Sequence, residues 1–162
     1  MVWVLQGPHN MRLTIRTIVC ALCLCGIAPV SAWAQASAGI RAGVSGSPDQ
    51  FFFGGHIETG PVAEHTTFRP NVEVGVGDGL TLLAINLEFA YHVPLKGHPW
   101  TVYFGGGPAA IISSPRGRNG SDVGGGFNIM LGIQARRGLF TELKVGFIDS
   151  PEVKLTIGYA FR

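Results

Sequence analysis

The stretch LAINLEFAYH at residues 83–92 decides the fold. Large apolar side chains alternate strictly with small or polar ones along it. One set is Leu83, Ile85, Leu87, Phe89 and Tyr91, and the other is Ala84, Asn86, Glu88, Ala90 and His92. Successive side chains of a β-strand point to opposite faces, so this period of two predicts a strand with one apolar face.

Seven further segments show the same alternation, and no convincing helical period interrupts them. They lie at residues 40–45, 51–58, 71–77, 100–107, 124–134, 139–147 and 153–161. Turn residues such as Gly77-Asp78-Gly79 and Asp149-Ser150-Pro151 separate them, and the longest polar connection runs over 113–122. The pattern predicts an all-β fold, an eight-stranded antiparallel up-and-down barrel whose even strand count lets the sheet close without an edge.

The composition favours a membrane barrel over a soluble domain. Charged residues make up 14% of the chain, glycine contributes 24 residues and the mean hydropathy is positive, whereas soluble domains average about 25% charged residues. Beyond residue 35 no stretch reaches the roughly 20 apolar residues of a spanning helix. Hydrophobicity dispersed over alternate positions is typical of transmembrane β-strands.

The content of the polar face predicts that this face lines the lumen. It is mostly Gly, Ala, Ser and Asn, whereas a strand face in water favours Thr, Lys and Glu and avoids glycine. The interior of an eight-stranded barrel is just wide enough to be filled by side chains. We therefore expect a lumen charge network of three cations and four carboxylates, paired in a plug: Arg41, Glu58, Glu73, Glu88, Glu142, Lys144 and Lys154.

Aromatic residues gather towards the ends of the predicted strands, with bulky aliphatic residues between them. This distribution predicts the interfacial aromatic girdles of a membrane barrel. The expected girdle residues are Phe51, Phe68, Tyr91, Trp100, Phe147, Tyr159 and Phe161.

The first 34 residues are expected to be a signal peptide. Arg12 and Arg16 supply a positive region, residues 18–28 an apolar one, and A-x-A sites predict cleavage after Ala34 or Ala36, which leaves 37–162 as the barrel. Residues 1–10 carry no positive charge, so we expect translation to start at Met11. The two leader arginines account for the formal net charge of +2. All three cysteines also lie in the leader, so we expect no disulfide in the mature chain.

Three segments carry a resemblance to a known family: FRPNVEVGVGDG at 68–79, VYFGGGPAAI at 102–111 and LTIGYAF at 155–161. They resemble the small outer-membrane β-barrel proteins of Gram-negative bacteria, with OmpA-like and OmpX-like barrel domains. The resemblance implies an outer-membrane location, contact with membrane lipids and recognition of the last strand by the barrel-assembly machinery. Two features depart from the family: Phe161 is penultimate, and nearly all connections are short.

No motif predicts a catalytic, cofactor or metal site. His56 shares a face with Glu58, and His92 lies four residues from Glu88, but no serine is coupled to either. The glycine runs 105–107 and 124–126 precede no helix, so we interpret them as strand bends and not as nucleotide loops.

Charge predicts few partners. Beyond the leader, ten basic and ten acidic residues balance without a basic stripe, which argues against nucleic acid. Arg116 and Arg118 in the longest connection are candidates for lipopolysaccharide phosphates. We expect a monomeric, non-enzymatic outer-membrane barrel with a structural or envelope-interaction role. The alternatives are a soluble periplasmic barrel that binds an apolar ligand, a narrow porin-like channel, and a lipid-modifying barrel enzyme.

Overall fold

The computed structural model describes residues 36–117 and 120–161, and the predicted signal peptide lies outside them. Nine strands form one antiparallel sheet in these residues. Their bounds are β1 Ser37–Gly46, β2 Gln50–Glu58, β3 Pro61–Ala63, β4 Thr66–Gly77, β5 Leu80–His92, β6 Trp100–Pro115, β7 Asp122–Ala135, β8 Leu139–Ile148 and β9 Val153–Phe161.

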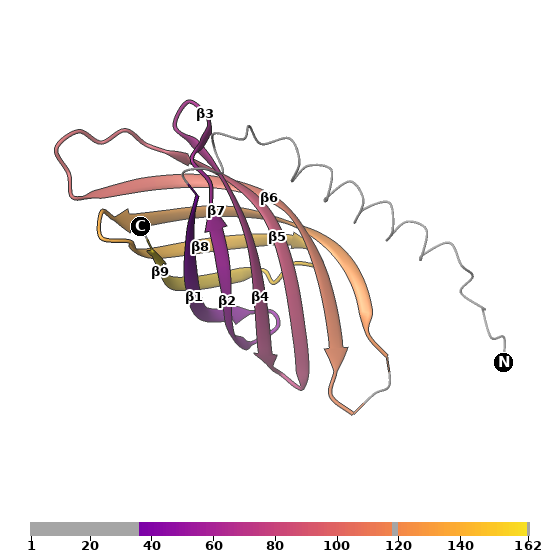
Figure 1. Ribbon diagram of the computed structural model, residues 1–162. Helices are drawn as coiled ribbons and strands as arrows, with labels where there is room; N and C mark the ends of the chain where they lie inside the picture. Colours follow the sequence, from indigo (N-terminus) through magenta and orange to yellow (C-terminus); the bar gives the residue numbers. More distant parts are fainter. Residues whose placement is uncertain (1–35, 118–119, 162) are drawn as a thin grey trace, which may run out of the picture.

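The eight long strands close into a barrel (Figure 1). Each long strand pairs with the long strands before and after it along the chain. The short β3 pairs only with β4. β1 pairs with β9, and β2 pairs directly with β4, so the sheet meets itself. The predicted eight-stranded up-and-down barrel is confirmed. Among the described residues, no helix has the length and apolar character needed to cross a membrane.

The eight predicted segments all become strands, but the longest connection is shorter than expected. β6 continues to Pro115 and β7 begins at Asp122, so residues 113–115 and 122 belong to strands. The extension follows from register: Ser113 pairs with Asp122, and Leu80 pairs with Pro115. The β4–β5 turn is also tight, with only Asp78 and Gly79 between the strands.

The barrel has two ends, which we call the terminal rim and the far rim. The terminal rim carries the start of β1, the end of β9 and the connections 59–65, 93–99 and 136–138. The far rim carries the connections 47–49, 78–79, 116–121 and 149–152. The figure places the C-terminus beside the terminal rim.

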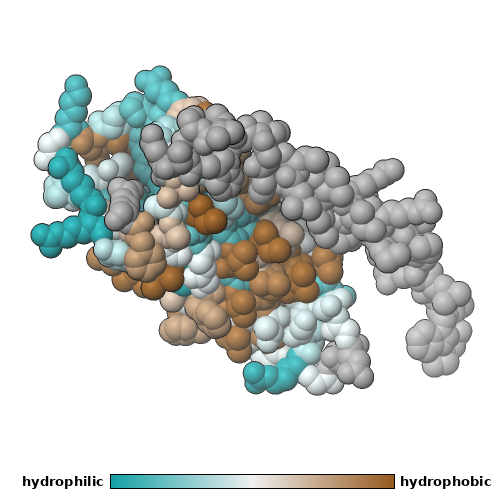
Figure 2. Space-filling view, in the orientation of Figure 1, coloured by the Kyte–Doolittle hydropathy of each residue, from teal (hydrophilic) through white to brown (hydrophobic). Residues whose placement is uncertain are grey.

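The outer wall is an apolar belt. Outward-facing aliphatic residues from the middles of the strands are about half exposed, among them Ile40 at 59% and Leu131 at 54%. Figure 2 shows hydrophobic residues across the middle of the described surface and hydrophilic ones towards its ends. Monomeric soluble proteins rarely expose apolar patches larger than a few hundred Å². The belt instead matches the lipid-facing band of a transmembrane barrel.

Two prolines inside strands mark interruptions of the ladder. β4 pairs with β5 through Pro70 and Leu87, whereas its pairing with β2 stops at Asn71. β6 pairs with β7 through Pro108 and Phe127, whereas its pairing with β5 skips Pro108. A proline has no backbone N–H to donate to a neighbouring strand. Each of these prolines therefore lies where its strand is unpaired on one side.

Candidate functional site

The candidate site is the lumen, where eight formal charges are buried. Four are cations and four are carboxylates, and six strands contribute them. They are Arg41 on β1, Glu58 on β2, Arg69 and Glu73 on β4, Glu88 on β5, Glu142 and Lys144 on β8, and Lys154 on β9. The lumen is therefore formally neutral.

Glu142 is the centre of the network near the terminal rim. Its Oε1 accepts a hydrogen bond from Arg41 Nη2 at 2.6 Å, and its Oε2 accepts one from Arg69 Nη1 at 3.2 Å. The Tyr103 hydroxyl donates to Oε2 at 2.8 Å, and Lys144 Nζ lies 3.6 Å from Oε1. One carboxylate thus joins β1, β4, β6 and its own strand across the lumen.

A second group of ion pairs continues towards the far rim. Lys144 donates to both oxygens of Glu88, at 2.7 and 2.9 Å, and lies 3.4 Å from Glu73 Oε1. Lys154 donates to the other oxygen of Glu73 at 2.7 Å, and Arg41 Nη1 lies 3.4 Å from Glu73 Oε1. Lys144 and Arg41 therefore link this group to Glu142.

An asparagine chain extends the network around the wall. Asn71 donates to Glu88 at 2.8 Å, Asn86 donates to Asn71 at 2.8 Å, and Asn128 donates to Asn86 at 2.8 Å. Asn86 lies on β5 and Asn128 on β7, so the last bond crosses over β6. Gly107, the register partner of Asn128, presents no side chain at this crossing.

Aromatic rings fill the rest of the interior beside the arginines. The Arg69 guanidinium lies over the Tyr103 ring at 4.7 Å and over the Phe140 ring at 5.3 Å from the centroid. Arg41 lies 5.6 Å from the Phe140 centroid. Cation–π contacts of this kind favour a desolvated cation by about 2 kcal/mol.

Four inward-facing rings have a glycine opposite them on a neighbouring strand. The register partners are Gly39 with His56, Gly43 with Phe52, Gly132 with Tyr103, and Gly158 with Phe140. A Cβ at any of these glycines would collide with the ring of its partner. The glycine-rich polar face is therefore a packing requirement of a narrow lumen.

The structure places the seven predicted lumen charges inside the barrel, each at most 5% exposed. It adds Arg69, which the sequence reasoning missed and which changes the expected count of three cations to four. The alternation Thr67, Arg69, Asn71, Glu73 carried the signal for Arg69. Pro70 obscured it, because a proline argues against a regular strand.

Six of the seven predicted girdle residues lie exposed on the outer wall. Tyr91, Trp100, Tyr159 and Phe161 surround the terminal rim, and Phe51 and Phe147 lie near the far rim. Phe68 differs, because it is only 2% exposed. Its ring packs 5.0 Å from that of Phe89, and Thr59 of the neighbouring connection hydrogen bonds to both of its backbone groups.

The two lumen histidines do not form a catalytic relay. Thr67 Oγ1 lies 3.1 Å from His92 Nε2, and Glu58 Oε1 lies 3.3 Å from the same nitrogen. A nucleophile–base–acid relay uses both ring nitrogens, one for each partner. The His56 ring packs edge-on against Phe140, and neither of its nitrogens has a hydrogen-bond partner in the described part of the chain.

A polar pocket of about 300 Å³ at the terminal rim is lined by Glu58, Thr67, His92 and Arg136, among others. Residues 36–117 and 120–161 contain no group of three or more His, Cys, Asp or Glu placed to hold a metal ion.

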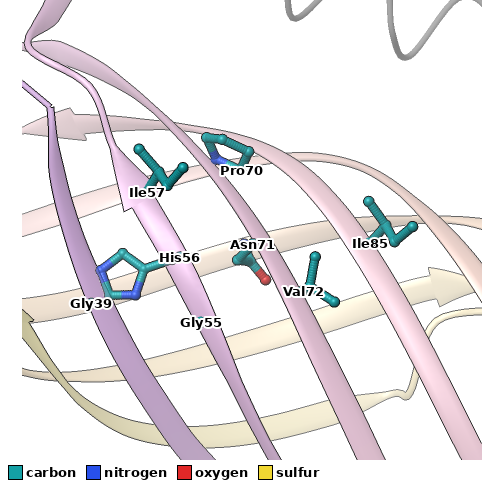
Figure 3. Close-up of a pocket in the computed structure, with 8 residues that line it drawn as sticks. All are labelled: Gly39, Gly55, His56, Ile57, Pro70, Asn71, Val72 and Ile85. Atoms are coloured by element: carbon teal, nitrogen blue, oxygen red, sulfur yellow. The ribbon is translucent and has the colours of Figure 1, made fainter. Parts of the chain in front are cut away.

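An apolar groove of about 420 Å³ lies in the outer wall (Figure 3). Ile57, Val72 and Ile85 line it, and it lies where Pro70 interrupts the β2–β4 ladder. The figure shows the His56 ring extending from β2 towards Gly39. The groove thus opens in the apolar belt, and its lining also includes His56 and Asn71, whose side chains are buried in the barrel.

The barrel geometry has counterparts among solved structures. The N-terminal β-barrel domain of Pseudomonas aeruginosa OprF is 16% identical, with a TM-score of 0.56 over 78% of this chain and 98% of that one. Neisserial surface protein A is 11% identical, with a TM-score of 0.62 over 77% and 94%. No family model matches the chain, and no curated protein matches it.

The class of protein follows from these findings. The chain is an eight-stranded antiparallel up-and-down β-barrel with the fold of these two solved structures, as the sequence predicted, and its outer wall carries an apolar belt. At these identities the likeness concerns the fold alone.

Proposed function

We propose that the protein is a non-enzymatic barrel of the outer membrane whose lumen is closed by its own side chains. The observation that carries this proposal is the Glu142 network, in which carboxylates and cations from opposite walls meet in the middle of the barrel. A lumen filled in this way suits a rigid scaffold that presents its rims and outer wall to the envelope. Its role is structural or interactive.

The apolar belt supports placement in a membrane over a soluble carrier. A soluble barrel that binds an apolar ligand needs an apolar chamber and a polar outer wall. Here the half-exposed aliphatic residues lie outside, and eight charges lie inside. The expected signal peptide and the solved outer-membrane barrels of the same fold support the outer membrane as the address.

Fractionation tests this placement. We expect the protein to sediment with outer membranes and to migrate faster in gel electrophoresis before boiling than after it, since closed barrels resist detergent at room temperature. Recovery in the soluble periplasmic fraction, with unchanged migration on boiling, would overturn the placement.

Single-channel recording in planar bilayers tests the closed lumen. We expect the native barrel to give no stable conductance, because paired side chains occupy the path. A variant that combines Glu142→Ala and Arg69→Ala removes two of the largest fully buried side chains and should conduct more. Reproducible conductance of the native barrel would favour the porin-like alternative.

A lipid-modifying activity is the remaining alternative, and among the described histidines only His92 lies beside both a hydroxyl and a carboxylate. Thr67 and Glu58 both lie beside the same nitrogen of His92, whereas a catalytic relay needs one partner on each ring nitrogen. We therefore expect no hydrolysis of phospholipid or lipid A. Activity of the native barrel that is lost in both His92→Ala and Thr67→Ala would overturn the non-enzymatic assignment. A parallel assay of His56→Ala tests the other lumen histidine.

Three kinds of partner are proposed for the barrel: membrane lipids, the barrel-assembly machinery and lipopolysaccharide. We propose that it is monomeric, contacts membrane lipids through the belt and is recognised by the barrel-assembly machinery through β9. Arg116 is exposed at the far rim and remains a candidate contact for lipopolysaccharide phosphates. Arg118 lies outside the described residues.

A further inference from the structure

Exposed charges are distributed unequally between the two rims in the described part of the chain. The terminal rim has three cations, Lys96, Arg136 and Arg137, against one carboxylate, Glu64, a formal charge of +2. The far rim has one cation against five carboxylates, a formal charge of −4: Arg116 against Asp49, Asp78, Asp122, Asp149 and Glu152. Because the lumen is formally neutral, this asymmetry dominates the field outside the barrel.

The three cations form what we call the basic collar: Lys96, Arg136 and Arg137. Two adjacent connections carry them. The backbone N–H of Arg136 donates to the carbonyl of Pro99 at 2.9 Å, and Trp100 is the register partner of Ala135. The 93–99 connection and the 136–138 turn are therefore joined, and all three side chains are exposed.

The outward-facing aromatic residues show a matching asymmetry. Among the described residues, the exposed Trp and Tyr side chains, Tyr91, Trp100 and Tyr159, all belong to the terminal rim. Near the far rim the exposed rings are those of phenylalanine, as at Phe51 and Phe147. Trp and Tyr have an apolar body and a polar group, so they favour the level of the lipid headgroups.

We propose that the basic collar binds the headgroups of anionic phospholipids, with Trp100 beside it at the boundary of the apolar belt. Arg136 and Arg137 follow Ala135, so they lie just beyond the end of a strand whose outer face is apolar up to Ile133. This is the level at which a phosphate beside the barrel would lie. The cations thus meet the phosphates of lipids whose acyl chains cover the belt.

The expected strength follows from surface electrostatics. A basic residue near an anionic membrane surface favours binding by up to about fivefold, and screening removes the effect beyond roughly 10 Å at 0.1 M salt. Three such residues give a preference of at least several-fold for an anionic over a zwitterionic lipid. The far rim, with its five carboxylates, offers no such preference.

Electron paramagnetic resonance with spin-labelled lipids tests the proposal. The barrel is reconstituted in phosphatidylcholine vesicles with traces of labelled phosphatidylglycerol or labelled phosphatidylcholine, and the immobilised fraction of each is measured. The test variant combines Lys96→Gln, Arg136→Gln and Arg137→Gln, and the matched control is Arg116→Gln at the opposite rim. Migration before and after boiling verifies that each variant is folded.

We expect the native barrel and Arg116→Gln to immobilise phosphatidylglycerol several-fold more than phosphatidylcholine, and the triple variant to lose most of this preference. About 1 M salt should abolish it in the native barrel as well. A native barrel without preference, or a triple variant that keeps it, would overturn the collar. If only Arg116→Gln lost the preference for phosphatidylglycerol, the site that binds anionic lipids would lie at the far rim. Lipopolysaccharide phosphates would then be the alternative ligand.

This inference rests on the proposed membrane placement, and the experiment separates the two. If the barrel is not a membrane protein, it immobilises neither lipid. If the barrel lies in the membrane but the basic collar does not bind anionic lipids, the barrel immobilises both lipids equally.

Discussion

Arg69 and Glu142 are 73 residues apart in the sequence and meet in the lumen, with Nη1 and Oε2 3.2 Å apart. The pair joins β4 to β8 across the barrel, and both side chains are fully buried. Glu142 also holds Arg41, so one carboxylate separates two guanidinium groups that would otherwise repel each other in a medium of low dielectric. The stability of the barrel should therefore depend more on Glu142 than on any other single charge.

Replacing Glu142 tests this dependence directly. Glu142→Gln removes the negative charge and leaves Arg41 and Arg69 buried without their shared anion. We expect the free energy of unfolding to fall by about 3–5 kcal/mol, measured by urea titration in micelles. The control is Glu152→Gln, an exposed far-rim carboxylate, which should change it by less than about 0.5 kcal/mol. Equal effects of the two variants would contradict the network.

A double-mutant cycle tests the second group of ion pairs. Lys144→Met and Glu88→Gln each remove one member of a buried ion pair, because Lys144 donates to both oxygens of Glu88. We expect the double variant to lose less stability than the two single variants together, by about 0.5–3 kcal/mol. Additive losses would show that the two side chains are stabilised independently.

A pair of arginine substitutions on one strand tests the membrane placement by depth. Ile129 and Val123 both lie exposed on the outer face of β7, Ile129 in the middle and Val123 near the far rim. In a bilayer, Ile129→Arg should cost about 2–4 kcal/mol and Val123→Arg about 0–1 kcal/mol. The measurement is unfolding in lipid vesicles. A soluble barrel would tolerate both substitutions, since both side chains would then face water.

Glycine substitutions test the pairing of rings with glycines. A Cβ at Gly158 would collide with the Phe140 ring and the Ile40 carbonyl, whereas a Cβ at Gly55 would meet only the Gly39 carbonyl at 3.4 Å. We expect Gly158→Ala to lower the unfolding free energy by about 1–3 kcal/mol through overpacking, and Gly55→Ala to have little effect. If Gly55→Ala proved equally damaging, strand conformation and not lumen packing would explain the glycines.

Local alternation was sufficient to predict the strands and the closed barrel, and the small residues and sparse charges of the polar face predicted that this face lines the lumen. It worked because a side chain's face depends only on its position along its own strand, as in residues 83–92. It was less reliable where the local pattern is mixed. At 68–71 an aromatic residue and a proline flank Arg69, and the proline interrupts the strand pattern there.

Only the tertiary structure decided which charges meet and how the lumen is filled. The partners of Glu142 come from β1, β4 and β6, and their distances depend on the stagger of eight strands around a closed wall. The burial of Phe68 likewise depends on how the 59–65 connection lies against β4. The sequence by itself determined the two faces of the wall, and the closure of the wall determined which residues those faces bring together.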